Sequence, residues 1–332
     1  MSLGGACLTP RSGSFWLVAP LLVLTVFGFQ ASASDAEAAT SSSFGVSGGT
    51  AHIRAATESA VPFILPGQGV TALDCPARNW CGGSLQDYLG DTYYSGESDE
   101  IRDRLVGNWP RRPVGTINRA LNGNHEMYSG GKSYFQALSS YFQQPASCFA
   151  LQNTGWILAC LDTSYQDFDL DIKQVEWLKS IVNAAGNRKL ILFSHHQPYS
   201  QLDDQGPKLQ IALADLLNTQ RIHAWFWGHE HRLVLYDPHP IWGLKGRCIG
   251  HGGFPGFRDD LPDAHGDVYQ WLILPAQPQA PKAQLLDGPN FWIPQQTVGF
   301  SPHGYVVLDF EGDTVWETYH VPNNIGLLKV QI

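Results

Sequence analysis

The sequence predicts an α/β fold in which helices pack on a central β-sheet. Short apolar runs of strand length recur from about residue 85 onward, and segments with apolar residues at helical spacing lie between them. Near the C-terminus, two further runs flank a turn centred on Gly312, which is a hairpin signal. This alternation of strands and helices favours an α/β architecture.

Six apolar runs are expected to form strands. They are Thr116–Leu121, Cys148–Gln152, Trp156–Leu161, Lys189–Phe193, Ala224–Trp227 and Arg247–Ile249. Between them, Asp171–Ala185 and Lys208–Asn218 carry apolar residues three and four positions apart, which predicts two helices. Gly304–Phe310 and Thr314–Val321 are expected to pair as the C-terminal hairpin, and the Pro- and Gly-rich segment Gly252–Pro302 is expected to be mostly loop.

The N-terminal region has the three parts of a secretory signal. Arg11 precedes the apolar stretch Phe15–Phe29, and the small residues Ala31-Ser32-Ala33 follow it, so residues 1–33 are predicted to be a signal peptide. The mature protein would then be secreted or periplasmic. If the stretch is an apolar extension without a targeting role, the protein is cytoplasmic. The stretch is too short for a comfortable membrane span, so we expect no stable one.

Residues 34–84 are rich in Ala, Ser, Thr and Gly, and they are expected to form a low-complexity arm or linker with one strand-like run at Gly69–Leu73. At 332 residues the chain is long enough for one large domain or two small ones. Its net charge of −9 gives no basic footprint for a nucleic-acid backbone, so we expect no nucleic-acid partner. The six cysteines show no legible disulfide framework.

Four polar clusters lie where predicted strands end, which is where ligands collect in open α/β sheets. They are Leu89–Gly96, Leu121–Glu126, Ser194–Pro198 and Trp227–His231. Alone, each can be an ordinary turn. Together they offer a carboxylate, a carboxamide and several imidazoles without a thiolate, which is the ligand set of a borderline divalent metal.

These clusters resemble the motifs of the calcineurin-like metallophosphoesterase superfamily, in its bacterial-type members. The matching segments are G-D-x-Y-Y-S-G at Gly90–Gly96, N-G-N-H-E-M-Y-S-G-G at Asn122–Gly131 and W-G-H-E-H-R at Trp227–Arg232. The resemblance implies two mixed β-sheets in a sandwich flanked by helices, forming a metallophosphoesterase domain over 85–322 and leaving 323–332 as a C-terminal tail. It also implies hydrolysis of a phosphomonoester or phosphodiester by a metal-activated hydroxide, with a small phosphorylated substrate or a phosphoprotein as partner.

The resemblance assigns five metal ligands and two divalent metal ions, drawn from Mn, Fe and Zn. Asp91 would bridge the two ions. Asn124, His195 and His229 would bind the second ion, and His231 the first. Because imidazole ligands must be neutral, activity is expected to fall in acid.

Three further histidines receive other roles. His125 would face the leaving-group oxygen as a general acid or hydrogen-bond donor. Counting from the preceding strand favours His195 as the ligand of its cluster, whereas counting back from Pro198 favours His196; we prefer His195 and place His196 at the substrate. His251 follows a predicted strand and either lines the substrate pocket or forms a polar turn.

One expected motif has no counterpart. The superfamily carries Asp-x-His at the end of its first strand, and no such triplet precedes Asp91. Asp74 is the nearest candidate, but Pro76 stands at the histidine position, and the gap to Asp91 is short for a helix and a returning strand. The alternative to an active enzyme is therefore a metallophosphoesterase-like binding protein with an incomplete first metal site.

Overall fold

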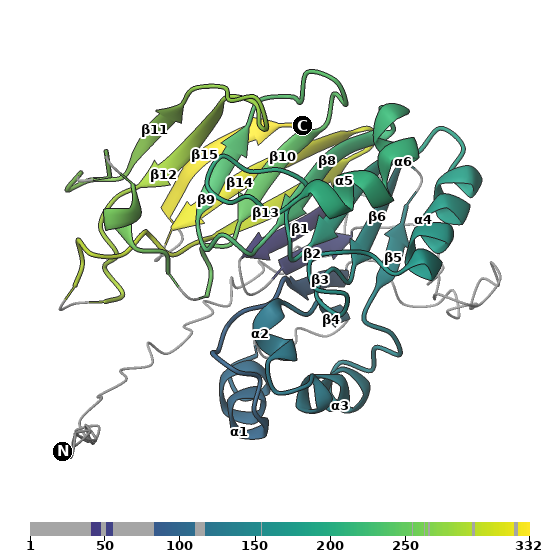
Figure 1. The fold of residues 1–332 in the computed structure, drawn as a ribbon, viewed down its shortest axis with the longest axis horizontal. Coiled ribbons are helices and arrows are strands. Elements are labelled where there is room, and N and C mark those ends of the chain that lie inside the picture. Colours follow the sequence, from purple (N-terminus) through teal and green to yellow (C-terminus); the bar gives the residue numbers. More distant parts are fainter. Residues whose placement is uncertain are drawn as a thin grey trace, which may run out of the picture.

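Two mixed β-sheets and several helices make up the described protein (Figure 1). The computed structural model describes residues 41–47, 51–55, 83–109, 117–153, 155–253, 255–261, 263–264, 266–293, 296–321 and 325–332. The predicted signal peptide and the strand-like run Gly69–Leu73 lie outside these residues.

The larger sheet has eight strands in the order β11-β12-β9-β10-β8-β7-β6-β5. Four neighbours, β10, β8, β7 and β6, run parallel. Of these, β6, β7 and β8 are mostly apolar, because both faces of a parallel strand are covered. The strands are β5 Phe149–Gln152, β6 Trp156–Leu161, β7 Lys189–Ser194, β8 Ile222–Trp227, β9 Leu233–Tyr236, β10 Lys245–Ile249, β11 Gln270–Leu274 and β12 Ala283–Asp287.

The smaller sheet has seven strands in the order β15-β14-β13-β1-β2-β3-β4. Its C-terminal part is the predicted hairpin, in which Gly312 takes the left-handed φ of 58° that a tight turn requires. The strands are β1 Ser41–Ser47, β2 Ala51–Ala55, β3 Gly83–Tyr88, β4 Ile117–Ala120, β13 Tyr305–Glu311, β14 Thr314–Val321 and β15 Ile325–Gln331.

Three helices cover the outer face of the larger sheet. They are α4 (Ile172–Ala184), α5 (Pro207–Ala212) and α6 (Ala214–Asn218). Asp171 begins α4 by accepting a hydrogen bond from the Lys173 backbone N–H at 2.8 Å. The remaining helices are α1 Ser98–Glu100, the π-helical η1 Ile101–Val106, α2 Asn124–Met127, α3 Lys132–Ser140 and the 3₁₀ turn η2 Arg258–Asp260.

Strand β6 shows how the layers pack. Trp156, Leu158 and Cys160 join the core that also contains Leu308 and Phe310 of β13, so this face packs against the smaller sheet. The alternate residues Ile157, Ala159 and Leu161 join the core under α4, α5 and α6. Period-two alternation therefore divides one buried strand between two cores. The predicted sandwich with flanking helices is confirmed.

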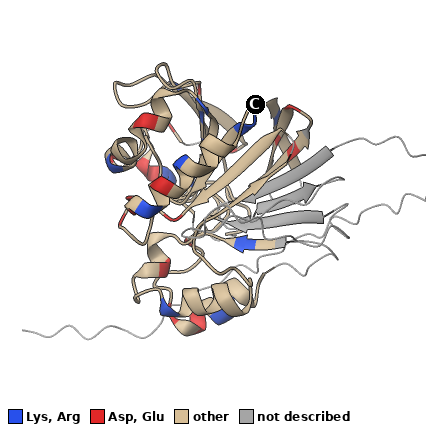
Figure 2. Ribbon diagram, turned by 90° about the vertical axis from the view of Figure 1, so that its right-hand side faces the viewer, with Lys and Arg blue, Asp and Glu red and all other residues tan. Residues whose placement is uncertain are grey.

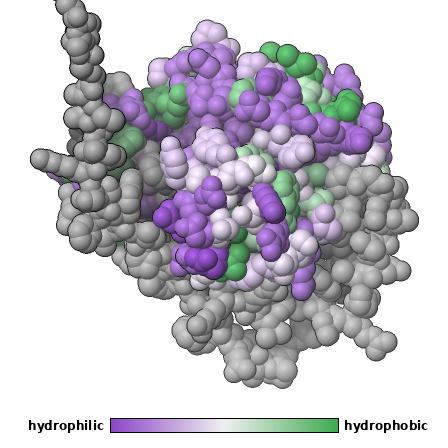
Figure 3. Space-filling view, turned by 60° about the horizontal axis from the view of Figure 1, so that its bottom comes forward, coloured by the Kyte–Doolittle hydropathy of each residue, from purple (hydrophilic) through white to green (hydrophobic). Residues whose placement is uncertain are grey.

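Charged residues lie on the helices, and some also lie on the described strands (Figure 2). The face seen from below in Figure 3 is mostly hydrophilic, with small separate hydrophobic areas. Among the described residues, no helix has both the length and the apolar character to cross a membrane.

The structure also differs from the predicted elements in four places. The segment expected to be an arm or linker contains β1 and β2, and the expected C-terminal tail forms β15. The expected loop Gly252–Pro302 contains β11 and β12. The single helix expected over Lys208–Asn218 is divided into α5 and α6 at Leu213, whose φ of −109° and ψ of 15° leave the helical region.

Candidate metal centre

The ends of four strands from both sheets meet at one place. Asp91 lies just beyond β3, Asn124 opens α2 beyond β4, and His195 follows β7 directly. His229 and His231 lie on the turn after β8. We call these five residues the carboxyl-end cluster, because each follows the carboxyl end of its strand.

Four ligand atoms converge within this cluster. The Nε2 atom of His195 lies 3.1 Å from Asp91 Oδ2, 2.9 Å from Asn124 Oδ1 and 3.0 Å from His229 Nδ1. Asn124 Oδ1 lies 3.1 Å from His229 Nδ1. The structure therefore brings together the three residues expected at the second metal and the expected bridging carboxylate.

Most of these atoms carry no hydrogen. The other ring nitrogen of His195, Nδ1, donates to the Leu89 carbonyl at 2.6 Å, so Nε2 offers a lone pair when the ring is neutral. Burial lowers the pKa of His195, but Asp91 outweighs burial and raises it, so a proton and a metal ion compete for Nε2. The Asn124 amide nitrogen donates to the Tyr128 hydroxyl at 2.6 Å, which directs its oxygen into the cluster. With His195 neutral, its Nε2, the Asn124 oxygen and the Asp91 oxygen are acceptors that face one another, and a cation among them would remove their mutual repulsion. The arrangement fits a divalent metal, and the Leu89 carbonyl is the outer partner that orients a metal-binding imidazole.

Asp91 also faces the other side of the cluster. Its Oδ2 lies 3.3 Å from His231 Nε2 as well as 3.1 Å from His195 Nε2, so one oxygen faces both expected metal positions. Burial raises the pKa of Asp91, but His195, His231 and His125 outweigh burial and hold the pKa well below its usual value. The carboxylate is therefore ionised.

The backbone around Asp91 is unusual. Asp91 and His231 have φ angles of 67° and 52°, in the left-handed region that non-glycine residues rarely adopt and that concentrates at functional sites. At Gly90, with a φ of 96°, a Cβ atom would lie 2.5 Å from the Gly123 Cα and 2.7 Å from His195 Nδ1. Glycine at position 90 therefore lets three loops of the cluster approach one another.

Glu126 fixes the first two loops, and the sequence analysis gave it no role. Its buried carboxylate accepts the Gly123 backbone N–H and, at 3.3 Å, the Asp91 backbone N–H. Glu126 is the third residue of α2, where a carboxylate that bonds back to the helix start is a recognised capping arrangement. The three-residue spacing between Gly123 and Glu126 is the sequence signal that could have identified this capping role.

Asp162 was also missed. It follows β6 and is buried, and its Oδ1 accepts hydrogen bonds from Asn122 Nδ2 at 2.8 Å and from the Ser164 backbone N–H at 3.1 Å. The Ser164 hydroxyl in turn donates to the Asn122 carbonyl at 3.0 Å. These bonds hold the loop that presents Asn124. The strand-end rule that selected the other clusters would have selected Asp162 as well.

His125 lies at the rim of the cluster. Its Nδ1 lies 2.6 Å from the Tyr94 carbonyl and therefore carries a hydrogen, while its Nε2 faces Asp91 Oδ2 at 3.9 Å. The side chain is 21% exposed. Nε2 is thus the nitrogen that can gain or lose a proton toward the cluster.

His196 lies beside the cluster, and with His195 and His229 it forms a group of ring nitrogens that all lie within 4.8 Å of one another. Its Nδ1 lies 3.1 Å from the Thr163 hydroxyl. Burial lowers the pKa of His196, and His195 and His229 lower it further, so its ring is neutral. Both histidines of this motif therefore approach His229, but the contacts to Asp91 and Asn124 are made by His195.

The structure does not bring His251 into the group. Its side chain is buried, and a Cβ atom at Gly304 would lie 2.6 Å from its Nε2. Burial lowers the pKa of His251 to about 3. Among the described residues, neither of its ring nitrogens has a hydrogen-bond partner.

One solved structure supports the fold. The chain is similar to purple acid phosphatase PPD1 from seeds of yellow lupin (Lupinus luteus), with 14% identity and a TM-score of 0.52 over 74% of this chain and 46% of that one. The chain thus spans less than half of the lupin protein. It is also similar to GAP50, the anchor in the inner membrane complex of Plasmodium, with 10% identity and a TM-score of 0.49 over 74% of this chain and 77% of that one. A dimetal phosphatase from Danio rerio has 13% identity and a TM-score of 0.41 over 74% of this chain and 82% of that one.

Part of the chain matches a family by sequence. No curated protein matches the chain significantly. Residues 88–233 match the family model of the calcineurin-like phosphoesterases, and this range contains Asp91, Asn124, His195, His229 and His231. The family implies metal-dependent hydrolysis of phosphoesters. Residues 88–233 are therefore a calcineurin-like phosphoesterase domain, as the motifs predicted.

Proposed function

We propose that the protein hydrolyses a phosphomonoester or a phosphodiester at the carboxyl-end cluster, in a metal-dependent reaction. The observation that carries the proposal is the convergence of Asp91 Oδ2, Asn124 Oδ1, His195 Nε2 and His229 Nδ1, whose described separations are 2.9–3.1 Å. Asp91, Asn124, His195 and His229 would hold one ion, and Asp91 and His231 would face a second. When bound, a divalent cation supplies Lewis acidity toward a phosphoryl oxygen.

The protein's own residues supply the remaining chemistry. His125 Nδ1–H is held by the Tyr94 carbonyl, which fixes the ring and leaves Nε2 toward the cluster. A proton on Nε2 can pass to the leaving-group oxygen, which is the role of a general acid. His195 is fully buried, whereas His125, His229 and His231 are each partly exposed, so water can reach the cluster past these three side chains.

The direct test is the metal content and activity of the purified protein. We expect at least one Mn, Fe or Zn ion per chain, and a melting temperature that falls on chelation because the ion binds the folded state. We also expect turnover of an aryl phosphate or a bis-aryl phosphodiester that chelation abolishes. If no transition metal is retained after incubation with each ion, the proposed site is wrong.

A second candidate function is binding without catalysis. The observation in its favour is that no Asp-x-His triplet precedes Asp91, so the expected source of two ligands for the first metal is missing from the sequence. A protein of this kind would bind metal and a phosphate-bearing ligand, but would hydrolyse neither ester class with any added metal. Introducing an Asp-x-His segment ahead of Asp91 and measuring turnover distinguishes an impaired enzyme, which would gain activity, from a binding protein that would not.

A further inference from the structure

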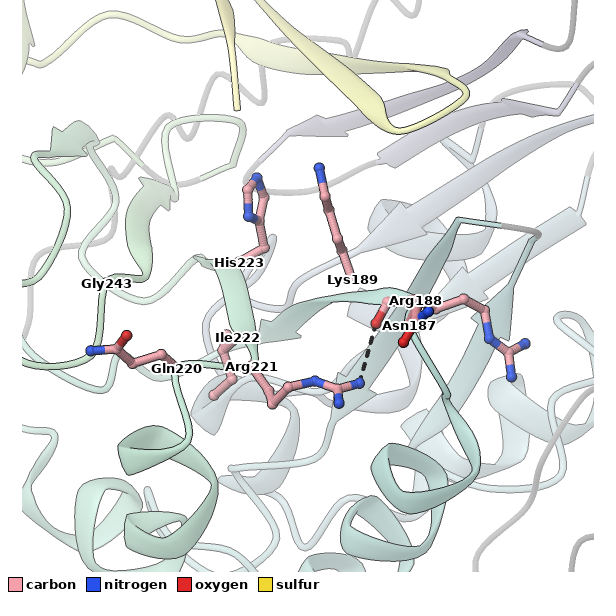
Figure 4. Close-up of a pocket in the computed structure, with 8 residues that line it drawn as sticks. All are labelled: Asn187, Arg188, Lys189, Gln220, Arg221, Ile222, His223 and Gly243. Carbon is pink, nitrogen blue, oxygen red and sulfur yellow. Dashed lines mark hydrogen bonds between the residues drawn. The ribbon is translucent and has the colours of Figure 1, made fainter.

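A second polar site lies at the opposite ends of the strands that carry the candidate metal centre. Here a pocket of about 360 Å³ opens at the amino ends of β7 and β8 (Figure 4). Its polar lining comes from Asn187, Arg188, Lys189, Gln220, Arg221 and His223, and we call it the amino-end pocket. β7 has six residues, which places the pocket about 20 Å from the carboxyl-end cluster.

The pocket is lined by cations and by no acid. Arg188, Lys189 and Arg221 line it, and Lys245 begins the adjacent strand β10. None of the ion pairs of Lys or Arg among the described residues involves any of these four side chains. In a chain with a net charge of −9, the three lining cations, none of which forms an ion pair among the described residues, make a local concentration of positive charge.

The cations are instead held by backbone carbonyls. Arg221 Nη2 donates to the Gly186 carbonyl at 2.9 Å, and Lys189 Nζ donates to the Asp313 carbonyl at 2.8 Å. Lys189 Nζ also lies 4.9 Å above the ring of Trp156. Arg188 turns away from the others (Figure 4) and donates to the Ala185 carbonyl. Neutral carbonyls position these side chains without cancelling their charge, so each can still bind an anion.

His223 occupies a bulge that directs it toward Lys189. In the parallel pairing of β7 with β8, Leu190 is opposite Ile222 and Ile191 is opposite Ala224, which leaves His223 as the extra residue. Bulges are rare between parallel strands and often redirect a side chain at a functional site. His223 and Lys189 project in the same direction from adjacent strands (Figure 4). His223 Nε2 is buried and has no hydrogen-bond partner among the described residues.

The titration behaviour of this region agrees with a surplus of positive charge. Burial lowers the pKa of His223, and Lys245, Lys189 and Arg247 lower it further, although a hydrogen bond to the Ile332 backbone opposes them. Burial also lowers the pKa of Lys245, and Arg247 and Lys189 add to that effect, whereas Glu317 opposes it. A bound anion would reverse these effects.

We propose that the amino-end pocket binds the phosphate group of a small molecule. A phosphate group in the pocket can accept hydrogen bonds from the lining side chains of Lys189 and Arg221, and its charge would favour a proton on the unpartnered Nε2 of His223. Charge-assisted bonds of this kind are the strong ones. The pocket volume lies at the lower end of the range for small-molecule sites and exceeds what one phosphate group fills. The site is separate from the proposed reaction centre and does not depend on a metal.

The experiment titrates inorganic phosphate into the full-length protein by calorimetry, with and without a chelator. Phosphate binding at the carboxyl-end cluster is expected to disappear with the metal, whereas binding at the amino-end pocket is expected to remain. Lys189→Gln and Arg221→Gln should each weaken the chelator-resistant binding about tenfold or more. Lys132→Gln removes the same charge from α3 and should leave it unchanged.

Because Lys189 packs on Trp156, its replacement can affect folding, and the melting temperature of each variant without phosphate shows whether the variant is folded. If Lys189→Gln does not fold, Arg221→Gln still tests the proposal. Chelator-resistant phosphate binding that is absent, or equal in wild type and Arg221→Gln, overturns the proposal. Acetate that binds as tightly as phosphate contradicts the assignment to a phosphate group. Absence of phosphoesterase activity does not bear on phosphate binding at the amino-end pocket, so this proposal and the proposed function fail independently.

Discussion

The two ends of strands β7 and β8 carry opposite chemistry. At the carboxyl ends, His195 and His229 face an amide oxygen and a carboxylate oxygen, and acceptors face one another. At the amino ends, Lys189 and Arg221 lie together without an acidic partner among the described ion pairs. One end thus requires a cation and the other attracts an anion. The same rigid parallel strands can hold both because each ends in loops whose sequence is independent of the buried run between them.

The largest expected effect comes from removing a metal ligand of the carboxyl-end cluster, which should leave the amino-end pocket unchanged. His229→Ala or Asn124→Ala should abolish stoichiometric metal binding and activity together, with a loss of affinity beyond the roughly 10- to 100-fold that an outer-shell partner is worth. Chelator-resistant phosphate binding should be unchanged. Elemental analysis, turnover and calorimetry on one preparation measure all three. His239→Ala, which removes a histidine from outside the cluster, serves as the control and should retain metal.

The next effect distinguishes chemistry from binding within the carboxyl end. His125→Ala should reduce turnover of an aryl phosphate by about 10²- to 10⁴-fold, the usual contribution of a positioned general acid. Its metal content should stay nearly constant, because its Nε2 lies 3.9 Å from Asp91 Oδ2 and outside the group of converging ligands. A variant that loses its metal would show that His125 is a ligand.

A third prediction compares how two histidines, His251 beyond β10 and His223 at the amino end of β8, contribute to the pH dependence of stability. The pKa of His251 is lowered from 6.5 to about 3 by burial, so between these values the unfolded chain binds a proton that the folded chain does not. Stability from this group is therefore present above pH 6.5 and is lost as the pH falls toward 3, at up to about 1.4 kcal/mol per pH unit.

Urea unfolding at several pH values, with a chelator present to remove metal linkage, measures this slope. His251→Asn should flatten it, and His223→Asn should flatten it less, because His223 is only partly buried. The remaining slope contains a contribution of the same sign from His303, whose pKa burial also lowers. Equal slopes in wild type and His251→Asn would contradict the assignment.

The smallest expected effect tests the support of the Asn124 loop. Asp162→Ala removes the oxygen that accepts from Asn122 and from the Ser164 backbone N–H, and should lower the free energy of unfolding by about 1–3 kcal/mol. Asp215→Ala removes an exposed carboxylate paired with Lys179 and should change the free energy of unfolding by less than about 1 kcal/mol. Metal affinity should fall in the first variant and not in the second. If the two variants behave alike, Asp162 does not support the loop.

The sequence predicted the interior of the molecule better than its edges. β6, β7, β8 and α4 were identifiable because buried parallel strands and an amphipathic helix have strong local patterns. β1, β2 and β15 are weakly apolar, and they are strands because partners far along the chain pair with them. β11 and β12 lie among prolines and pair only with each other and β9.

The same distinction applies to the site. The four strand-end clusters were visible as motifs, and the structure brings their expected ligands together. Whether His195 or His196 contacts Asp91 could not be decided from sequence, because adjacent residues beyond a strand point in directions that the next turn determines. Glu126 and Asp162 act by holding other residues, and a role of that kind becomes visible only when the loops are placed in space.

The position of β1 has a consequence for synthesis. It lies between β13 and the strands β2 and β3, and Ser41 is opposite Glu311. The smaller sheet therefore cannot close until the ribosome has made β13, and β1 remains without this partner until then. Contacts of such long sequence separation slow folding and leave strand edges open to other chains. Nascent chains arrested before β13 should consequently be bound by chaperones and should fold only after release.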